Sequence, residues 1–127
     1  MNRKQHRGVV TANHGILAAS QPLAVSAGLA VLQRGGNFAD AAIAVSAVLC
    51  VVEPYNSQIG GDAFLIVYDA AAHQTTALNG SGAAPRQASA DKFPDGIPVR
   101  GLASASVPGL VAVWADLHKK WGSIPMV

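Results

Sequence analysis

The side chains that most often carry out catalysis or bind metals are few and scattered in this chain. The four histidines and the one cysteine stand at no spacing that metal sites use; they are His6, His14, His73, His118 and Cys50. The carboxylates of the central region are dispersed among structural positions and form no pair suited to acid–base catalysis; they are Asp40, Glu53, Asp62 and Asp69. The sequence therefore predicts neither a metal nor a cofactor.

The segment Gly60-Gly61-Asp62 has the composition of a phosphate-binding loop but not its pattern. It lacks the Gly-Lys-Ser/Thr ending of a P-loop, and it leads into an apolar run and not into a helix. Paired glycines suit a tight turn in which the backbone approaches its neighbours closely. We therefore expect a glycine hinge here, with Asp62 capping or bridging nearby groups, and no nucleotide site.

The residues on either side of this hinge predict a helix and a strand. Asn37 is a good N-cap, and Asp40, three residues on, stands where the acid of a capping box belongs. Residues 39–52 are almost all apolar, so this helix is expected to be buried on most sides, and Pro54 forbids its continuation. The apolar run 64–68 is typical of a strand covered on both faces. Together they indicate a layered α/β protein.

The residues before this region predict one more strand and one more helix. Residues 8–12, with Val9 and Val10 at their centre, have the β-branched composition of a strand. Ser20 is a candidate N-cap for a helix that runs to about residue 34, and Pro22 is tolerated in its first turn. The residues expected on one face of this helix are Leu23, Ala27, Ala30 and Val31.

The residues after the hinge predict a hairpin, a long loop and a third helix. The turn at 70–73 returns the chain through a strand at 75–78, and residues 79–82 are too glycine-rich for a strand interior. Prolines and glycines mark 85–100 as a surface excursion. A helix is then expected from about residue 108 to Gly122, with an apolar stripe formed by Leu110, Trp114, Leu117 and Trp121.

Composition narrows the classes of protein that the chain can represent. Half of the 127 residues are hydrophobic and only 13% are charged, about half the usual ~25%, as expected for a piece of a larger core. The net charge of +2 has no aromatic interleaving, so nucleic acid is not a predicted partner. The longest apolar run is too short to cross a membrane, and no signal-peptide core follows the basic residues 3–7, so a cytoplasmic location is expected.

Five motifs in order resemble the N-terminal part of the gamma-glutamyltranspeptidase family. They are GVVTANHGILAASQPLAVSAGLAVLQRGGN, DAAIAVSAVLCVVEP, IGGDAF, LNGSGAAP and ASVPGLVAVW, and the resemblance runs from about Gly8 to Pro125. It implies the α/β (α+β) fold of an αββα-sandwich N-terminal-nucleophile hydrolase, incomplete in this chain. Residues 1–127 would then be an N-terminal fragment of the large-subunit region, with no complete second domain.

The resemblance also implies how the complete protein works. Family members cleave themselves, and the freed N-terminal threonine of the small subunit attacks an amide, its own α-amine serving as the base. Thr75 and Thr76 are not that threonine, because they sit in the expected return strand and lack the Thr-Thr-His pattern. We therefore assign no catalytic residue to this chain and expect the nucleophile in a missing C-terminal part or small subunit.

Ser81 stands where the family carries a substrate-binding arginine. That arginine pairs with the α-carboxylate of the glutamyl group, and its planar fork suits a carboxylate. Counting back from Ala84-Pro85 places Ser81 at its position, between Asn79-Gly80 and Gly82. Asn79, Ser81 and Gly82 are accordingly the predicted substrate-binding residues, for a small-molecule amide with a smaller or less charged acyl group.

Alternatives remain at this point for both the substrate and the activity. Oxamate amidohydrolase-like and acylase-like members share a Gly-Ser-Gly-like turn, so hydrolysis of a non-glutamyl amide competes with classical transpeptidation. Arg86 is the first positive charge after the turn and is a candidate replacement for the lost arginine, although its place after Pro85 suits an exposed loop. The chain alone is also compatible with an inactive remnant or a binding module.

Overall fold

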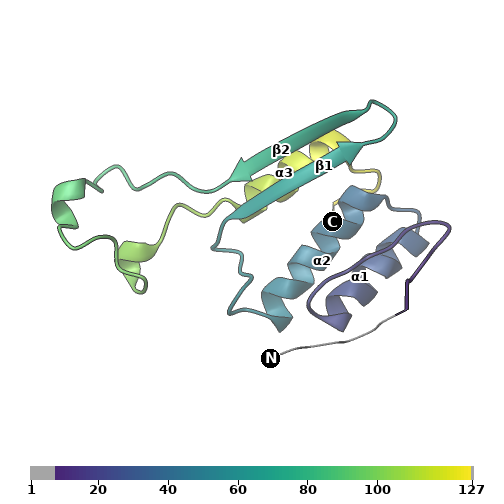
Figure 1. Ribbon diagram of the computed structural model, residues 1–127, viewed down its shortest axis with the longest axis horizontal. Helices are drawn as coiled ribbons and strands as arrows, with labels where there is room; N and C mark the ends of the chain where they lie inside the picture. The colour runs from purple at the N-terminus through teal and green to yellow at the C-terminus, as the bar shows by residue number, and fades with distance from the viewer. Residues whose placement is uncertain (1–7, 127) are drawn as a thin grey trace.

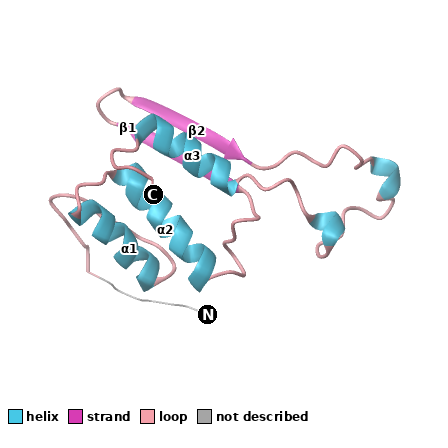
Figure 2. Cartoon of the chain, turned by 180° about the vertical axis from the view of Figure 1, so that it is seen from behind, coloured by secondary structure: helices cyan, strands magenta, loops and turns pink. Residues whose placement is uncertain are grey.

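The computed structural model describes residues 8–126, which form three helices, one hairpin and two short 3-10 turns (Figures 1 and 2). In chain order the elements are α1 (Pro22–Gln33), α2 (Phe38–Val52), β1 (Ala63–Asp69), β2 (Gln74–Gly80), the 3-10 helices Ala90–Lys92 and Leu102–Ser104, and α3 (Leu110–Trp121). The prediction of a mixed helix-and-strand protein is therefore confirmed. None of the helices within residues 8–126 is both long and apolar enough to cross a bilayer.

The predicted strand at residues 8–12 is wrong. These residues adopt no regular structure, and the side chain of Val9 is 94% exposed. A strand exists only where a neighbour satisfies its backbone donors and acceptors. The sheet in the described part of the chain consists of β1 and β2 alone, so the β-branched residues at 9 and 10 have no strand to pair with there.

Only one face of the hairpin packs against the core. β1 and β2 pair antiparallel, with Leu65 opposite Leu78 and Val67 opposite Thr76 on the face toward the helices. On the other face Phe64 is 73% and Ile66 76% exposed. The expectation that this strand is covered on both faces is therefore wrong for these residues, because α3, the helix of the described residues that contacts the hairpin, lies on one side of it.

The core joins α2 and α3 to the hairpin. Ala39 of α2, Val67 of β1 and Leu117 of α3 form the buried cluster, with Leu65 and Trp121 packed against it. The predicted stripe of α3 is confirmed, with Leu110 and Leu117 buried, Trp114 and Trp121 half-buried, and Val113 added to it. α2 is less buried than predicted, since most of its residues after Ala41, Cys50 included, are only half-buried.

α1 packs on α2 through small residues. Its buried positions are Ala24, Gly28 and Val31, and Leu23, expected on the inner face, is 65% exposed. A Cβ at Gly28 would lie 2.7 Å from side-chain atoms of both Leu17 and Val45. The small residues thus let the helices approach closely, and the face they define is rotated from the one expected from the larger side chains.

The predicted cap of α2 is confirmed, whereas that of α1 is wrong. The Asn37 side chain accepts hydrogen bonds from the N–H groups of Ala39 at 2.9 Å and Asp40 at 3.3 Å, and the Asp40 carboxylate accepts one from the Asn37 N–H at 2.9 Å, which completes the capping box. Gln21, and not Ser20, precedes α1, and its side chain makes no capping bond. The Ser20 hydroxyl instead donates to Glu53 at the end of α2.

The long loop and the end of β2 position the site described below. Residues 85–100 form the predicted surface excursion, which reaches away from the helices and hairpin (Figure 1). The expectation that Asn79 and Gly80 lie outside the strand is wrong: they pair with Phe64 and Ala63 as the last residues of β2. Gly80 fits there because it has no side chain, since a Cβ would lie 2.1 Å from Val113.

Candidate functional site

Three segments that are distant in sequence meet at the open end of the hairpin. Asp62 directly precedes β1, Ser81 directly follows β2, and Ser106 lies in the stretch that enters α3. The antiparallel register brings the first two together, because Ala63 pairs with Gly80. The segment with Ser106 is held beside them by two hydrogen bonds, because the Gly61 carbonyl accepts the N–H groups of Gly109 and Leu110 at 3.0 Å each.

The carboxylate of Asp62 is the centre of this arrangement. It accepts the Ser106 hydroxyl at 3.0 and 3.1 Å, the Gly82 N–H at 3.2 Å and, more weakly, the Ser81 hydroxyl at 3.5 Å. Every one of these donors is a neutral group. The prediction that Asp62 bridges neighbouring groups beside the glycine hinge is thereby confirmed, and its side chain remains exposed.

Glycines make the convergence of these segments possible. A Cβ at Gly82 would lie 1.5 Å from the carbonyl oxygen of Val107, and one at Gly109 would lie 1.9 Å from that of Gly80. The Val107 N–H in turn donates to the Ala83 carbonyl at 3.4 Å. Because these residues have no side chain, the turn 79–82 lies directly against the backbone that enters α3.

The structure brings together the three residues predicted to bind substrate, and each of them makes a different hydrogen bond within the fold. The Asn79 side chain accepts the Ser81 N–H at 2.9 Å and so shapes the turn, as asparagine often does. The Gly82 N–H is directed to Asp62. The Ser81 hydroxyl is only weakly engaged, through the 3.5 Å contact to Asp62. Substrate binding by these residues stays a prediction.

Ser106 is the member of this cluster that the sequence did not reveal. It lies in the motif ASVPGLVAVW, which predicted only the start of a helix, and its partner Asp62 is 44 residues away. Arg86, the candidate replacement for the family's arginine, is exposed in the loop. None of the hydrogen bonds to Asp62 or Ser81 in the described residues comes from it.

A cavity of about 440 Å³ opens beside this cluster. Gly82 and Ser106 lie at its border with the cluster, Lys92 contributes a positive charge, and the remaining lining is largely apolar; that lining includes Pro85, Phe93, Ile97, Leu102 and Ala103. An apolar space bordered by a few polar groups is the usual form of a small-molecule site. The turn 79–82 therefore stands at the rim of a space large enough for a small acyl group.

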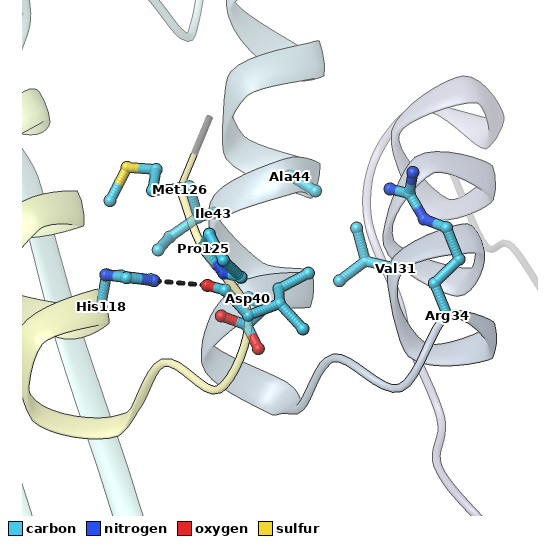
Figure 3. A pocket seen from close by; sticks show the side chains of 9 residues that line it. Val31, Arg34, Asp40, Ile43, Ala44, His118, Pro125 and Met126 are labelled. Atoms are coloured by element: carbon cyan, nitrogen blue, oxygen red, sulfur yellow. Dashed lines mark hydrogen bonds between the residues drawn. The ribbon is translucent and has the colours of Figure 1, made fainter.

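A second cavity, of about 490 Å³, lies between α1, α2 and the residues after α3 (Figure 3). Two of its polar side chains, His118 and Asp40, are used within the fold. The His118 Nε2 lies 2.7 Å from the Ile124 carbonyl and must be the protonated nitrogen, because a carbonyl only accepts. The Asp40 carboxylate accepts both the N–H and the hydroxyl of Ser123. This cavity is a joint between helices in which His118 and Asp40 are hydrogen-bonded within the fold, with Arg34 also in its lining.

Asp40 and Glu53, which lie outside the cluster, have lowered pKa values. Burial alone would raise the pKa of Asp40, but the bonds from the Ser123 hydroxyl and from the N–H groups of Asn37, Ser123 and Ile124 together lower it. The hydroxyl of Ser20 and the amide of Asn56 lower the pKa of Glu53, against a smaller opposing effect of burial. Both residues tie distant segments together, so their role is structural.

Comparison with known protein families matches one of them over most of the chain. A family model described as gamma-glutamyltranspeptidase matches residues 24–127. The glutathione hydrolase-like YwrD proenzyme of Bacillus subtilis (strain 168) is 39% identical over 107 residues, which cover 82% of this chain and 20% of that protein. The chain thus spans about a fifth of the length of this relative.

Solved structures agree in fold. The cephalosporin acylase from Bacillus halodurans superposes with a TM-score of 0.85 and 42% identity, over 95% of this chain and 23% of the acylase. The gamma-glutamyltranspeptidase of Helicobacter pylori gives 0.84 and 32% identity, over 92% of this chain and 35% of that one. The three helices and the hairpin therefore form a portion of a larger, known fold.

Proposed function

Because this chain belongs to the gamma-glutamyltranspeptidase family, we propose that it is the N-terminal part of the large subunit of a self-cleaving amidohydrolase or acyltransferase. The nucleophilic threonine lies outside these residues, in the small subunit. Two observations support this proposal. The similar Bacillus subtilis protein is named a proenzyme, and the chain spans only a fraction of each relative, which leaves room for the rest of such an enzyme.

The chemistry proposed for the complete protein is acyl transfer through a threonyl ester. The threonine hydroxyl attacks the amide carbonyl, its proton passes to the threonine's own α-amine, and that amine protonates the departing amine. Water or an acceptor amine then cleaves the ester. The residues of this chain supply no nucleophile in this scheme; they bind and orient the acyl group through the turn 79–82.

The proposed substrate is a small amide whose acyl group is not glutamyl. The observation that carries this choice is the position of Ser81, which stands where the family's carboxylate-binding arginine is expected and lies 3.5 Å from the carboxylate of Asp62. A serine beside an acid offers none of the bidentate attraction that an arginine gives an α-carboxylate. Oxamate-like or acylase-like amide hydrolysis is favoured over classical transpeptidation on this ground.

Assays of the complete protein, purified after self-cleavage, test this proposal. We expect two subunits, and a higher kcat/KM for amides that lack a glutamyl α-carboxylate than for γ-glutamyl anilide. Faster turnover of the γ-glutamyl anilide would reject the substrate assignment. An uncleaved protein inactive on every amide would support the inactive-remnant or binding-module alternative. A cytoplasmic location stays a prediction, and fractionation of cells that express the complete protein tests it.

A further inference from the structure

We propose that Asp62 sets the acyl specificity of this enzyme. It disfavours amide substrates whose acyl chain ends in a carboxylate and favours those whose acyl chain ends in a group with N–H bonds. The inference rests on the proposed function and names the substrate class more closely. It assigns the role to a residue that the sequence pattern indicated only as a bridge. The donor expected is an amide whose acyl chain ends in a carboxamide or an ammonium group.

The geometry places Asp62 within reach of whatever the turn binds. The Ser81 hydroxyl is a weakly engaged donor of the turn, and it lies 3.5 Å from Asp62 Oδ2. A carboxylate that accepted this hydroxyl would sit about 5 Å from the Asp62 carboxylate, a separation at which like charges disfavour each other. The same distance allows a bound N–H group to turn toward Asp62.

The Asp62 carboxylate also has capacity left for one more donor. A carboxylate offers about four acceptor positions. Its partners are the Ser106 hydroxyl, shared between both oxygens, the Gly82 N–H on Oδ1 and the distant Ser81 hydroxyl on Oδ2. All are neutral, so the negative charge is not compensated by these contacts. Oδ2 is therefore the oxygen that would accept a terminal carboxamide or ammonium group.

The expected discrimination follows from the charge separation. At about 5 Å the repulsion of a terminal carboxylate amounts to about a fourfold loss of binding in fully aqueous surroundings and about a 300-fold loss at an effective dielectric constant of ~20. Because Asp62 is exposed, we expect a value in the lower part of this range, about five- to twentyfold. Removing the charge should abolish most of it.

The experiment compares two anilides that differ only at the remote end of the acyl chain, glutaryl 4-nitroanilide with a carboxylate and its terminal carboxamide. The self-cleaved complete protein is assayed as wild type, as Asp62→Asn and as Asp116→Asn. Asn keeps the shape of the side chain and one acceptor oxygen. Asp116 is exposed on α3 and is not a member of the cluster, so its variant controls for the loss of one negative charge.

The ratio of kcat/KM for the carboxamide to that for the carboxylate separates specificity from structure. A purely structural role would lower both constants and leave the ratio unchanged. We expect the ratio to favour the carboxamide in the wild type, to fall at least about fourfold in Asp62→Asn, and to stay constant in Asp116→Asn. An unchanged ratio in Asp62→Asn would overturn the inference while amide hydrolysis stood. Turnover of neither anilide would also overturn the inference, whereas the proposed function falls only if the complete protein hydrolyses no amide at all.

The wild-type protein gives a second test that holds even where Asp62→Asn does not self-cleave. Raising the ionic strength from about 0.01 to about 1 M shortens the screening length from about 30 to about 3 Å. Repulsion by Asp62 then weakens, and the carboxamide-to-carboxylate ratio should fall. A ratio that stays level or rises with salt would contradict the inference, because attraction of the carboxylate by a positive site has the opposite sign.

Discussion

Asp40 offers the sharpest test of how this part of the fold is held together. Its carboxylate accepts the Asn37 N–H at 2.9 Å, the Ser123 N–H at 3.1 and 3.2 Å, and the Ser123 hydroxyl at 2.6 Å. It therefore joins the start of α2 to a residue 83 positions later in the chain. Asp40→Ala removes all of these acceptors at once.

The magnitude of the loss can be worked out from these bonds. The capping-box bond to the Asn37 N–H contributes about 1 kcal/mol. The Asp40 side chain is only 6% exposed, so water replaces its bonds poorly, and a donor left unsatisfied costs about 1–3 kcal/mol. We expect Asp40→Ala to lower the free energy of local opening by about 2–4 kcal/mol. Asp40→Asn, which keeps one acceptor, should cost less than Asp40→Ala.

Hydrogen exchange of the complete protein measures this opening directly. A loss of about 2–4 kcal/mol corresponds to exchange that is about 30- to 700-fold faster at the amides of Asn37 and Ser123. Mass spectrometry of peptides from both segments should show the increase in Asp40→Ala, and Asp116→Asn should match the wild type. Exchange within about threefold of the wild type at both amides would refute the reasoning, because the tether would then contribute little.

Three further predictions concern acid, the glycines of the site and the open sheet face. Stability should be constant at neutral pH and fall below about pH 4.5. The folded-state pKa values of Asp40 and Glu53 are lowered, so the stability they contribute is present above their unfolded-state pKa values and is lost as the groups become protonated. A urea titration at several pH values checks this, and stability that rose on acidification would contradict it. Gly82→Ala should prevent correct folding or self-cleavage, because its Cβ would lie 1.5 Å from a carbonyl oxygen. Gly60→Ala has open space around it and should be tolerated. Gel analysis of self-cleavage compares the two variants, and equal cleavage would count against the close approach at Gly82. The isolated 127-residue chain should self-associate through its exposed hairpin face, and Ile66→Glu, at a residue 76% exposed, should reduce this association; light scattering reports the mass, and a monomeric wild-type chain would be the contrary result.

Features that depend on neighbouring residues could be predicted from the sequence. The capping box at Asn37 and Asp40 spans three residues, and the stripe of α3 follows from its period, so both were found. Ser20 was misassigned because the partner of its hydroxyl, Glu53, is 33 residues away. Isolated residue types cannot indicate whether a nearby or a distant group takes such a hydrogen bond.

The strands show the same limit for hydrogen bonds between backbone groups. The hairpin was predictable from its turn and its apolar run, but the strand at residues 8–12 was not formed, since pairing depends on partners that composition does not reveal. The N-terminal-nucleophile hydrolase fold came from the five ordered motifs, and the likeness to the acylase and transpeptidase structures confirms it. The exposed face of β1 fits a chain that forms only part of that fold.

The candidate site was predicted in part. The resemblance located the turn at Asn79, Ser81 and Gly82, and the glycine hinge indicated a bridging role for Asp62. The contact between Asp62 and Ser106 could not be predicted, because it depends on how the entry to α3 packs against the hairpin across 44 residues of chain. Only the folded backbone, with glycines at 80, 82 and 109, brings these groups together.

The central claim is that this chain belongs to a protein that cleaves itself and forms a threonyl acyl-enzyme. Intact-mass spectrometry of the complete purified protein, mixed with an amide donor and quenched rapidly with acid, tests it most directly. We expect two subunits, with this chain in the larger one, and the mass of one acyl group added to the N-terminal threonine of the smaller. A single uncleaved chain, or two subunits of which neither ever carries the acyl group, would contradict the account.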